Sequence, residues 1–159
     1  MSITIRAALP SDVPVILRFI QGLAEYEKLS YACVATEAAL SATLFGAHPY
    51  AEVLLASWCG APAGFALFFH NYSTFLAKPG IYLEDLFVEP SVRGKGLGKA
   101  LLGQLARVAV DRGCGRLEWS VLDWNEPAIQ FYKSLGAVAM DEWTGYRVTG
   151  EALAALAQH

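Results

Sequence analysis

Apolar and polar residues alternate along several short stretches of the chain, as they do in strands that bury one face. In longer stretches the apolar residues recur every three or four positions, which is the spacing of a helix packed on a core. The alternating stretches and several short apolar runs predict strands over residues 3–6, 53–58, 63–72, 81–88, 115–121, 137–140 and 143–148. The helical spacing predicts helices over residues 13–26, 37–46, 97–112, 126–135 and 149–157.

Residues that favour turns and helix ends support these boundaries. Asn125 precedes one predicted helix as its N-cap, Pro127 lies in the first turn, and Gly136 ends the helix. Residues 59–62 form a turn that joins two strands into a hairpin. The order of elements, with one strand–helix–strand crossover, predicts a mixed α/β sheet. Because no linker or repeat divides the chain, we expect a single domain over residues 1–159.

The composition is that of a folded chain, with 55% hydrophobic and 17% charged residues. No apolar run reaches the roughly 18–20 residues of a membrane span, and the N-terminus lacks a signal-peptide pattern. Three cysteines without metal-ligand spacing fit reduced cytoplasmic thiols, and three scattered histidines form no metal motif. A net charge of -3 gives no basic surface for nucleic acid and suits a cationic small molecule. We therefore expect a cytoplasmic protein that binds no nucleic acid, membrane or metal.

A glycine-rich stretch lies between the strand that ends at residue 88 and the helix that begins at residue 97. Glycine lets an anion approach the backbone closely, and the N-terminus of the following helix favours negative charge. The stretch, called the glycine loop below, consists of Arg93, Gly94, Lys95, Gly96, Leu97, Gly98 and Lys99. We interpret it as a pyrophosphate site, and the alternative is a simple turn with solvated lysines.

The spacing of the glycine loop excludes two common phosphate-binding motifs. The triphosphate loop requires G-x-x-x-x-G-K-[ST], but Ala100 follows Lys99, so the hydroxyl that binds magnesium is missing. The dinucleotide fingerprint G-x-G-x-x-G also fails, because Lys99 or Leu101 occupies its last position. The pattern that remains is R-x-x-G-x-G over residues 93–98.

This pattern, together with three further segments, resembles the spermidine/spermine acetyltransferase-like branch of the GNAT superfamily of N-acetyltransferases. The pattern lies within IYLEDLFVEPSVRGKGLGKALL, and the other segments are IRAALPSDVPVILRFIQGLAEYEK, FGAHPY and WNEPAIQFYKSLGA. The resemblance extends over nearly the whole chain. The resemblance implies the GNAT fold, a mixed, mostly antiparallel twisted sheet of about seven strands flanked by helices. It also implies acetyl-CoA as co-substrate and a homodimer.

The resemblance implies that the glycine loop binds acetyl-CoA. Phe87 and Val88 would offer main-chain hydrogen bonds to its pantetheine arm. Asn125 and Lys133 are implied as further cofactor contacts. The alternatives are that Asn125 only caps its helix and that Lys133 is a solvated helix residue.

Acetyl transfer to an amine needs a base, because a primary ammonium has a pKa of about 10.4. Glu84 and Asp85 are the candidates, and alternation along a strand predicts that they point to opposite faces. The resemblance implies that Glu84 is the base, through water, and that Tyr132 protonates the leaving thiolate. A backbone amide near Val88 would stabilise the oxyanion. The alternatives are a carboxylate that is only ion-paired and a tyrosine that belongs to the core.

For the amine itself, the resemblance points to Tyr26, Glu27, Glu84 and Asp85, and less directly to Trp58 and Trp119. We expect a small polyamine or diamine to be acetylated directly. Tyr146 stands where mammalian polyamine enzymes have Trp, which leaves thialysine-like or lysine-like acceptors open. A non-catalytic sensor of acetyl-CoA is the alternative from another class, although it would not need both Glu84 and Tyr132.

Overall fold

The computed structural model describes residues 2–159, and within them it contains five strands and five α-helices. In chain order these are β1 (Ile3–Ala7), α1 (Val13–Tyr26), α2 (Glu37–Leu44), β2 (Glu52–Trp58), β3 (Ala61–Ser73), β4 (Lys78–Val88), α3 (Leu97–Asp111), β5 (Leu117–Trp119), α4 (Glu126–Ser134) and α5 (Gly150–Leu156). Short 3-10 turns lie at Pro10–Asp12, Ser30–Ala32 and Pro90–Val92. The chain divides into two compact units, one that ends at Leu122 and one over Asp123–His159. The first unit holds the whole sheet with α1, α2 and α3.

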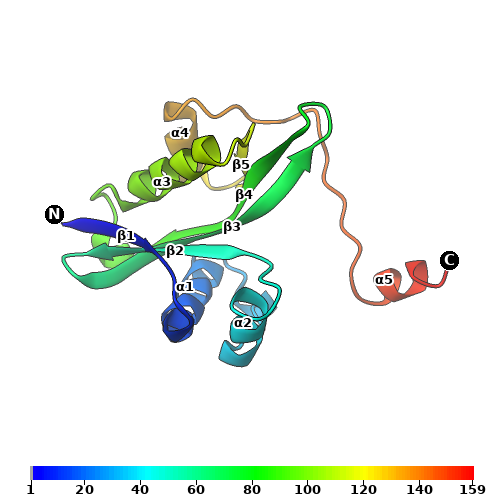
Figure 1. Ribbon diagram of the computed structural model, residues 1–159, viewed down its shortest axis with the longest axis horizontal. Coiled ribbons are helices and arrows are strands. Elements are labelled where there is room, and N and C mark those ends of the chain that lie inside the picture. The colour runs from blue at the N-terminus through cyan, green and yellow to red at the C-terminus, as the bar shows by residue number, and fades with distance from the viewer. Residues whose placement is uncertain (1) are drawn as a thin grey trace. The chain divides into compact units, whose positions relative to one another are not determined.

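The five strands form one sheet in the order β1-β2-β3-β4-β5 (Figure 1). The first four strands are antiparallel neighbours. Strand β5 pairs in parallel with β4, and α3 provides the crossover that a parallel pair requires. The predicted mixed, mostly antiparallel sheet, its β2–β3 hairpin and its crossover are therefore confirmed.

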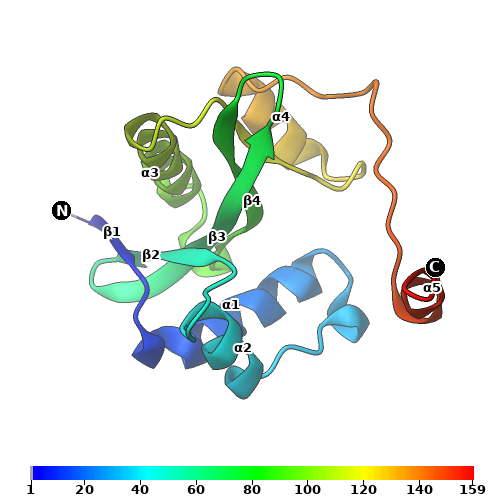
Figure 2. The same ribbon diagram turned by 45° about the vertical axis from the view of Figure 1, so that its right-hand side comes forward.

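Helices cover both faces of this sheet, with α1 and α2 on one face and α3 on the other (Figures 1 and 2). On the α1 face, Ile16 and Phe19 pack with Phe65 and Phe87 of the sheet. The ring centre of Phe19 lies 5.8 Å from that of Phe65 and 5.9 Å from that of Phe87. On the α3 face, Leu101 is completely buried. Both helices are therefore held on the sheet by the apolar side chains that recur at helical spacing in the sequence.

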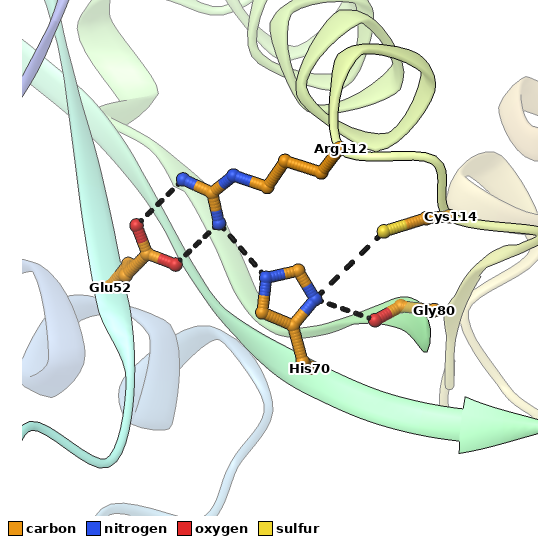
Figure 3. A network of polar contacts seen from close by, with 5 residues as sticks. All are labelled: Glu52, His70, Gly80, Arg112 and Cys114. Carbon is orange, nitrogen blue, oxygen red and sulfur yellow. Dashed lines mark hydrogen bonds and ion pairs between the residues drawn. The ribbon is translucent and has the colours of Figure 1, made fainter. Parts of the chain in front are cut away.

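A polar network attaches the C-terminal end of α3 to the sheet (Figure 3). Arg112 donates two hydrogen bonds, of 2.7 and 3.0 Å, to the carboxylate of Glu52 in β2. Its Nη1 also lies 2.9 Å from Nε2 of His70 in β3, and His70 Nδ1 lies 3.0 Å from the carbonyl oxygen of Gly80. Because a carbonyl only accepts, His70 carries its proton on Nδ1 and accepts from Arg112. The thiol of Cys114 completes the network, 3.9 Å from His70 Nδ1.

Three expectations concern metal sites, disulfides and membrane spans. Residues 2–159 contain no group of three or more His, Cys, Asp or Glu side chains arranged to hold a metal ion. Cys33, Cys59 and Cys114 are free thiols. Within the same residues, every helix is too short or too polar to cross a bilayer.

The sheet has five strands where the sequence predicted about seven. Strand β5 covers three residues of the predicted 115–121. The strands predicted over 137–140 and 143–148 do not form, since residues 137–149 contain neither helix nor strand. A strand needs a neighbour that accepts its backbone N–H groups and donates to its carbonyls. Apolar residues such as Val138 and Tyr146, which are exposed here, favour a strand, but they do not supply that neighbour.

Gly64 in β3 allows strand β4 to approach closely. A Cβ atom at this position would lie 2.5 Å from the carbonyl oxygen of Phe87 and 3.3 Å from Cα of Val88. We expect Gly64→Ala to lower the free energy of unfolding, measured in urea, by about 1–3 kcal/mol, because the backbone of β4 has to move. Gly103→Ala in α3 is the control, since its Cβ would meet only Nη1 of Arg107 at 3.8 Å. It should raise the same free energy by about 0.5–1 kcal/mol, and equal effects of the two variants would contradict the close approach.

Candidate active site

A β-bulge in β4 determines where one of the two candidate carboxylates points. Leu67 of β3 pairs with Asp85 of β4, whereas the next residue, Phe68, pairs with Leu83. Glu84 is therefore the extra residue of the bulge. Paired residues point to the same face, and Leu67 packs on the core beneath α1, so Asp85 lies on the α1 face. The simple alternation that the sequence suggested does not hold through this point, because the bulge shifts its phase.

Glu27, Glu84 and Asp85 form an acidic cluster at the C-terminal end of α1. Burial raises the pKa of Asp85 to about 6, and repulsion from Glu84 and Glu27 adds to this effect. Burial, followed by repulsion from Glu84, also raises the pKa of Glu27. Asp85 is half-buried, whereas Glu84 is exposed. A cation among these side chains would relieve their repulsion, so the cluster suits a positively charged ligand.

Tyr26, the last residue of α1, contacts the first residue of the glycine loop. The guanidinium carbon of Arg93 lies 4.9 Å from the centre of the Tyr26 ring and 5.6 Å from the centre of the Phe87 ring. Its Nε donates a hydrogen bond of 2.9 Å to the carbonyl oxygen of Val88. Arg93 thereby connects the glycine loop with both α1 and the end of β4.

Two glycines of the loop adopt backbone angles that other residues rarely adopt, and all three glycines face open space. The φ angle is 80° at Gly94 and 92° at Gly96, the N-cap of α3. A Cβ atom at Gly94, Gly96 or Gly98 would meet no atom of the described chain within 4 Å. The next residue, Leu97, is 1% exposed and anchors the first turn of α3 in the core. The buried Leu97 side chain thus fixes the loop to the core, while the glycine side of the loop remains open.

This arrangement fits a pyrophosphate group. Gly96 has no side chain that could bond the first N–H groups of α3, so these donors remain for a ligand. Arg93, Lys95 and Lys99 are exposed and surround the loop with positive charge. Nζ of Lys95 lies 5.3 Å from the centre of the Trp58 ring, which places Trp58 beside the loop.

The second unit contains the remaining predicted residues, on or next to α4. The side chain of Asn125 accepts a hydrogen bond of 3.4 Å from the N–H of Ala128, so the predicted N-cap is confirmed. Tyr132 is half-buried, with its ring centre 5.7 Å from that of Phe131. Lys133 is exposed in the last turn. The catalytic and cofactor-binding roles of these residues stay predictions.

The structure brings seven of the predicted residues together within the first unit, namely Tyr26, Glu27, Glu84, Asp85, Phe87, Val88 and Arg93. Trp119 lies in β5, where it pairs with Leu83 of β4.

Sequence reasoning missed how α1 meets β4. Arg18, Gly22 and Tyr26 are spaced four residues apart along α1. Gly22 packs against β4, and Arg18 contacts the residue that follows β4. Nε of Arg18 lies 3.5 Å from the carboxylate of Glu89, and a Cβ atom at Gly22 would lie 2.7 Å from the Phe87 ring. A glycine inside a helix was the available signal, because it often marks close packing.

Comparison with known proteins gives a family match that includes most of the chain. The chain matches the Acetyltransferase (GNAT) family over residues 20–137. A thialysine N-epsilon-acetyltransferase from Sus scrofa is 41% identical, over 98% of this chain and 98% of the relative. An L-ornithine N5-acetyltransferase from Arabidopsis thaliana is 38% identical, over 96% of this chain and 86% of the relative. Among solved structures, an integron cassette protein from the mobile metagenome of V. cholerae superimposes with a TM-score of 0.84 and 30% identity, and the match covers 100% of this chain and 99% of that one.

The chain belongs to the acetyltransferase (GNAT) family. It is an acetyl-CoA-dependent N-acetyltransferase, which transfers the acetyl group of acetyl-CoA to an amine. The predicted fold class, activity and co-substrate are therefore confirmed. The geometry of the glycine loop fits a pyrophosphate, and its binding of coenzyme A stays a prediction.

Asp85 should make the stability of the protein depend on pH. Its pKa of about 6 in the folded chain exceeds the value of about 3.9 in an unfolded chain. The folded state therefore binds more protons between about pH 4 and 6, and stability contributed by protonated Asp85 is lost as the pH rises through this range.

We expect Asp85→Asn to be more stable than the wild type at pH 8, by about 1–2 kcal/mol. The change removes a carboxylate charge that is partly buried and is repelled by Glu84 and Glu27, and partial exposure reduces the full effect. The difference should vanish near pH 3, below both pKa values, where wild-type Asp85 is protonated in both states. Urea denaturation at the two pH values measures it. Asp111→Asn at the end of α3, on the other face of the sheet, is the matched control. A stability difference for Asp85→Asn that is the same at both pH values would contradict the prediction.

Proposed function

We propose that the acceptor is a small molecule with two ammonium groups, one of which is the terminal primary amine that becomes acetylated. The acidic cluster is the observation that carries this proposal. Glu27, Glu84 and Asp85 repel one another in the absence of a cation, and two of them are partly withdrawn from water. Two positive charges on one acceptor would compensate this cluster better than a single charge.

Two kinds of acceptor meet this description. Diamino acids such as ornithine and thialysine carry an α-amino group and a side-chain amine. The similar enzymes from Sus scrofa and Arabidopsis thaliana act on these compounds, as their names state, and they support diamino acids as the first choice. Polyamines and simple diamines are the second candidate, favoured by the number of carboxylates in the cluster, because all charges of a polyamine are positive.

Glu84 is the base in this proposal. The acceptor amine is protonated at neutral pH and must lose a proton before it can attack. Glu84 is exposed at the bulge, where a proton can leave directly or through water. Asp85, Glu27 and Tyr26 hold the cationic acceptor beside it.

When bound, acetyl-CoA supplies the acetyl group as an activated thioester. The N–H of Val88 is proposed to stabilise negative charge on the acetyl oxygen, and the main chain of Phe87 and Val88 to orient the pantetheine arm. Tyr132 is proposed to donate the proton that the leaving sulfur requires. The glycine loop is proposed to bind the pyrophosphate of coenzyme A, and Asn125 and Lys133 are proposed as further contacts to it.

A thiol-release assay with acetyl-CoA and a panel of amines tests the acceptor. We expect ornithine and thialysine to exceed spermidine and 1,3-diaminopropane in kcat/KM by about tenfold or more, with monoamines weaker still. A preference for spermidine would select the polyamine alternative. If coenzyme A binds but no amine of the panel releases thiol, the proposed class of acceptor would be wrong.

Substitution of Tyr132 tests the proposed acid. Tyr132→Phe removes the hydroxyl and keeps the ring that contacts Phe131. We expect kcat to fall by roughly 10²–10⁴, with the affinity for coenzyme A nearly unchanged. Steady-state kinetics and calorimetric titration with coenzyme A measure the two quantities. Unchanged turnover would assign the proton to water.

We also propose a homodimer in which the C-terminal segment is covered. Val138, Met140, Trp143 and Tyr146 are between 63% and 96% exposed, although each is apolar or aromatic. Such a concentration of exposed apolar side chains is typical of an interface.

Light scattering coupled to gel filtration should therefore give twice the 17.2 kDa of one chain. Trp143→Asp should shift the protein toward monomer, because a charge would have to be buried. Phe75→Asp, at a residue that is 99% exposed in the turn between β3 and β4, should leave the dimer intact. A monomeric wild-type protein, or equal effects of the two changes, would contradict the proposed interface.

We propose further that the two units fold as one domain, since the family match over residues 20–137 crosses the boundary after Leu122. A single cooperative unfolding transition would support this, and two separate transitions would oppose it.

The three free thiols support the cytoplasm as the compartment.

A further inference from the structure

Arg93 is the side chain through which the glycine loop touches the acceptor side of the site. Its guanidinium packs on the ring of Tyr26, at the end of α1, with 4.9 Å between its carbon and the ring centre. A second ring, that of Phe87, lies 5.6 Å away. Its Nε donates to the carbonyl oxygen of Val88 at 2.9 Å. Contacts to α1 and β4 thus define the position of an exposed arginine that belongs to neither element.

These contacts leave the outer edge of the guanidinium available. The ring of Tyr26 interacts with the positive charge, and the Val88 carbonyl occupies only Nε. The two η nitrogens form no hydrogen bond with any described residue. They present a planar pair of donors, which matches two oxygens of a phosphate group.

An arginine that is already fixed binds a phosphate more tightly than a freely rotating one, because less conformational entropy is lost on binding. Arg93 opens the R-x-x-G-x-G pattern, and the open backbone of Gly94 and Gly96 follows directly. Its orientation therefore bears on how well the loop receives a pyrophosphate.

We propose that Tyr26 is a positioning residue for coenzyme A, which it serves by holding Arg93 in the orientation that binds the pyrophosphate. This inference rests on the proposed function, since it requires the glycine loop to bind coenzyme A. It gives Tyr26 a role on the donor side in addition to its contact with the amine. Because Glu27 of the acidic cluster follows Tyr26 directly, the two halves of the site share one short segment of chain.

Calorimetric titration with coenzyme A alone, without amine or turnover, tests the inference. Tyr26→Leu removes the ring, and it should weaken the binding of coenzyme A about three- to tenfold. Tyr26→Phe is the matched control, because it keeps the ring and should change the affinity by less than about twofold. Tyr26 is 39% exposed, so truncation should leave the fold intact, which thermal unfolding verifies. If Tyr26→Leu unfolds, Tyr26→Met, with a larger apolar side chain, takes its place.

A double-mutant cycle shows whether Tyr26 acts through Arg93. Arg93→Gln should weaken coenzyme A binding on its own, and adding Tyr26→Leu to it should cause no further loss. Arg93→Lys should not restore the affinity, because an ammonium lacks the planar pair of donors.

Three results would overturn the inference. These are wild-type affinity in Tyr26→Leu, equal losses in Tyr26→Leu and Tyr26→Phe, and a loss in the double variant that equals the sum of the two single losses. A wild-type protein that does not bind coenzyme A would overturn the proposed function as well. Normal wild-type binding with no effect of Tyr26 would overturn this inference alone.

Discussion

The bulge at Glu84 is the constraint on which the site depends. Ile81 and Leu83 pair with His70 and Phe68 and point with them toward α3, whereas Phe87 belongs to the core beneath α1. A strand of strict period two would send Ile81, Leu83 and Phe87 to the same face, since all three are odd-numbered. One extra residue changes the phase, so a single strand supplies apolar side chains to both helical layers. Asp85 is carried to the α1 face by the same shift.

The energetics explain why an acidic residue persists there. Burial of a phenylalanine side chain contributes about 1.5–3 kcal/mol, and Phe87 is 5% exposed between α1 and the sheet. Asp85 lies two residues earlier, so the phase that buries Phe87 also brings Asp85 next to Glu27 and Glu84. The burial of the Asp85 charge, together with its repulsion by Glu84 and Glu27, is the cost of this arrangement. A cationic acceptor would reduce that cost, so the unfavourable electrostatic energy of the acidic cluster favours binding of a cation.

The sequence was sufficient for the class of fold, the glycine loop and the cap of α4. Hydrophobic spacing located the helices, and Asn125 before Glu126 and Pro127 predicted the start of α4. The bulge could not be predicted, because IYLEDLFV contains no glycine or proline that would mark it and register is decided by the pairing with β3. The two C-terminal strands were wrong for a related reason. Alternation describes one strand, whereas a strand forms only with a neighbour, and the sequence does not identify the neighbour.

The acidic cluster places opposing demands on the reaction. Carboxylates that attract an ammonium group also stabilise its proton, so recognition by Glu27 and Asp85 makes the amine harder to deprotonate. A base at the same place must then pass its proton to water, which a buried carboxylate does poorly. The bulge separates these tasks along one strand, since Asp85 is half-buried toward α1 while Glu84 remains exposed. In the proposed mechanism, Asp85 holds the charge and Glu84 releases the proton, and the irregularity in β4 is what allows neighbouring residues to do both.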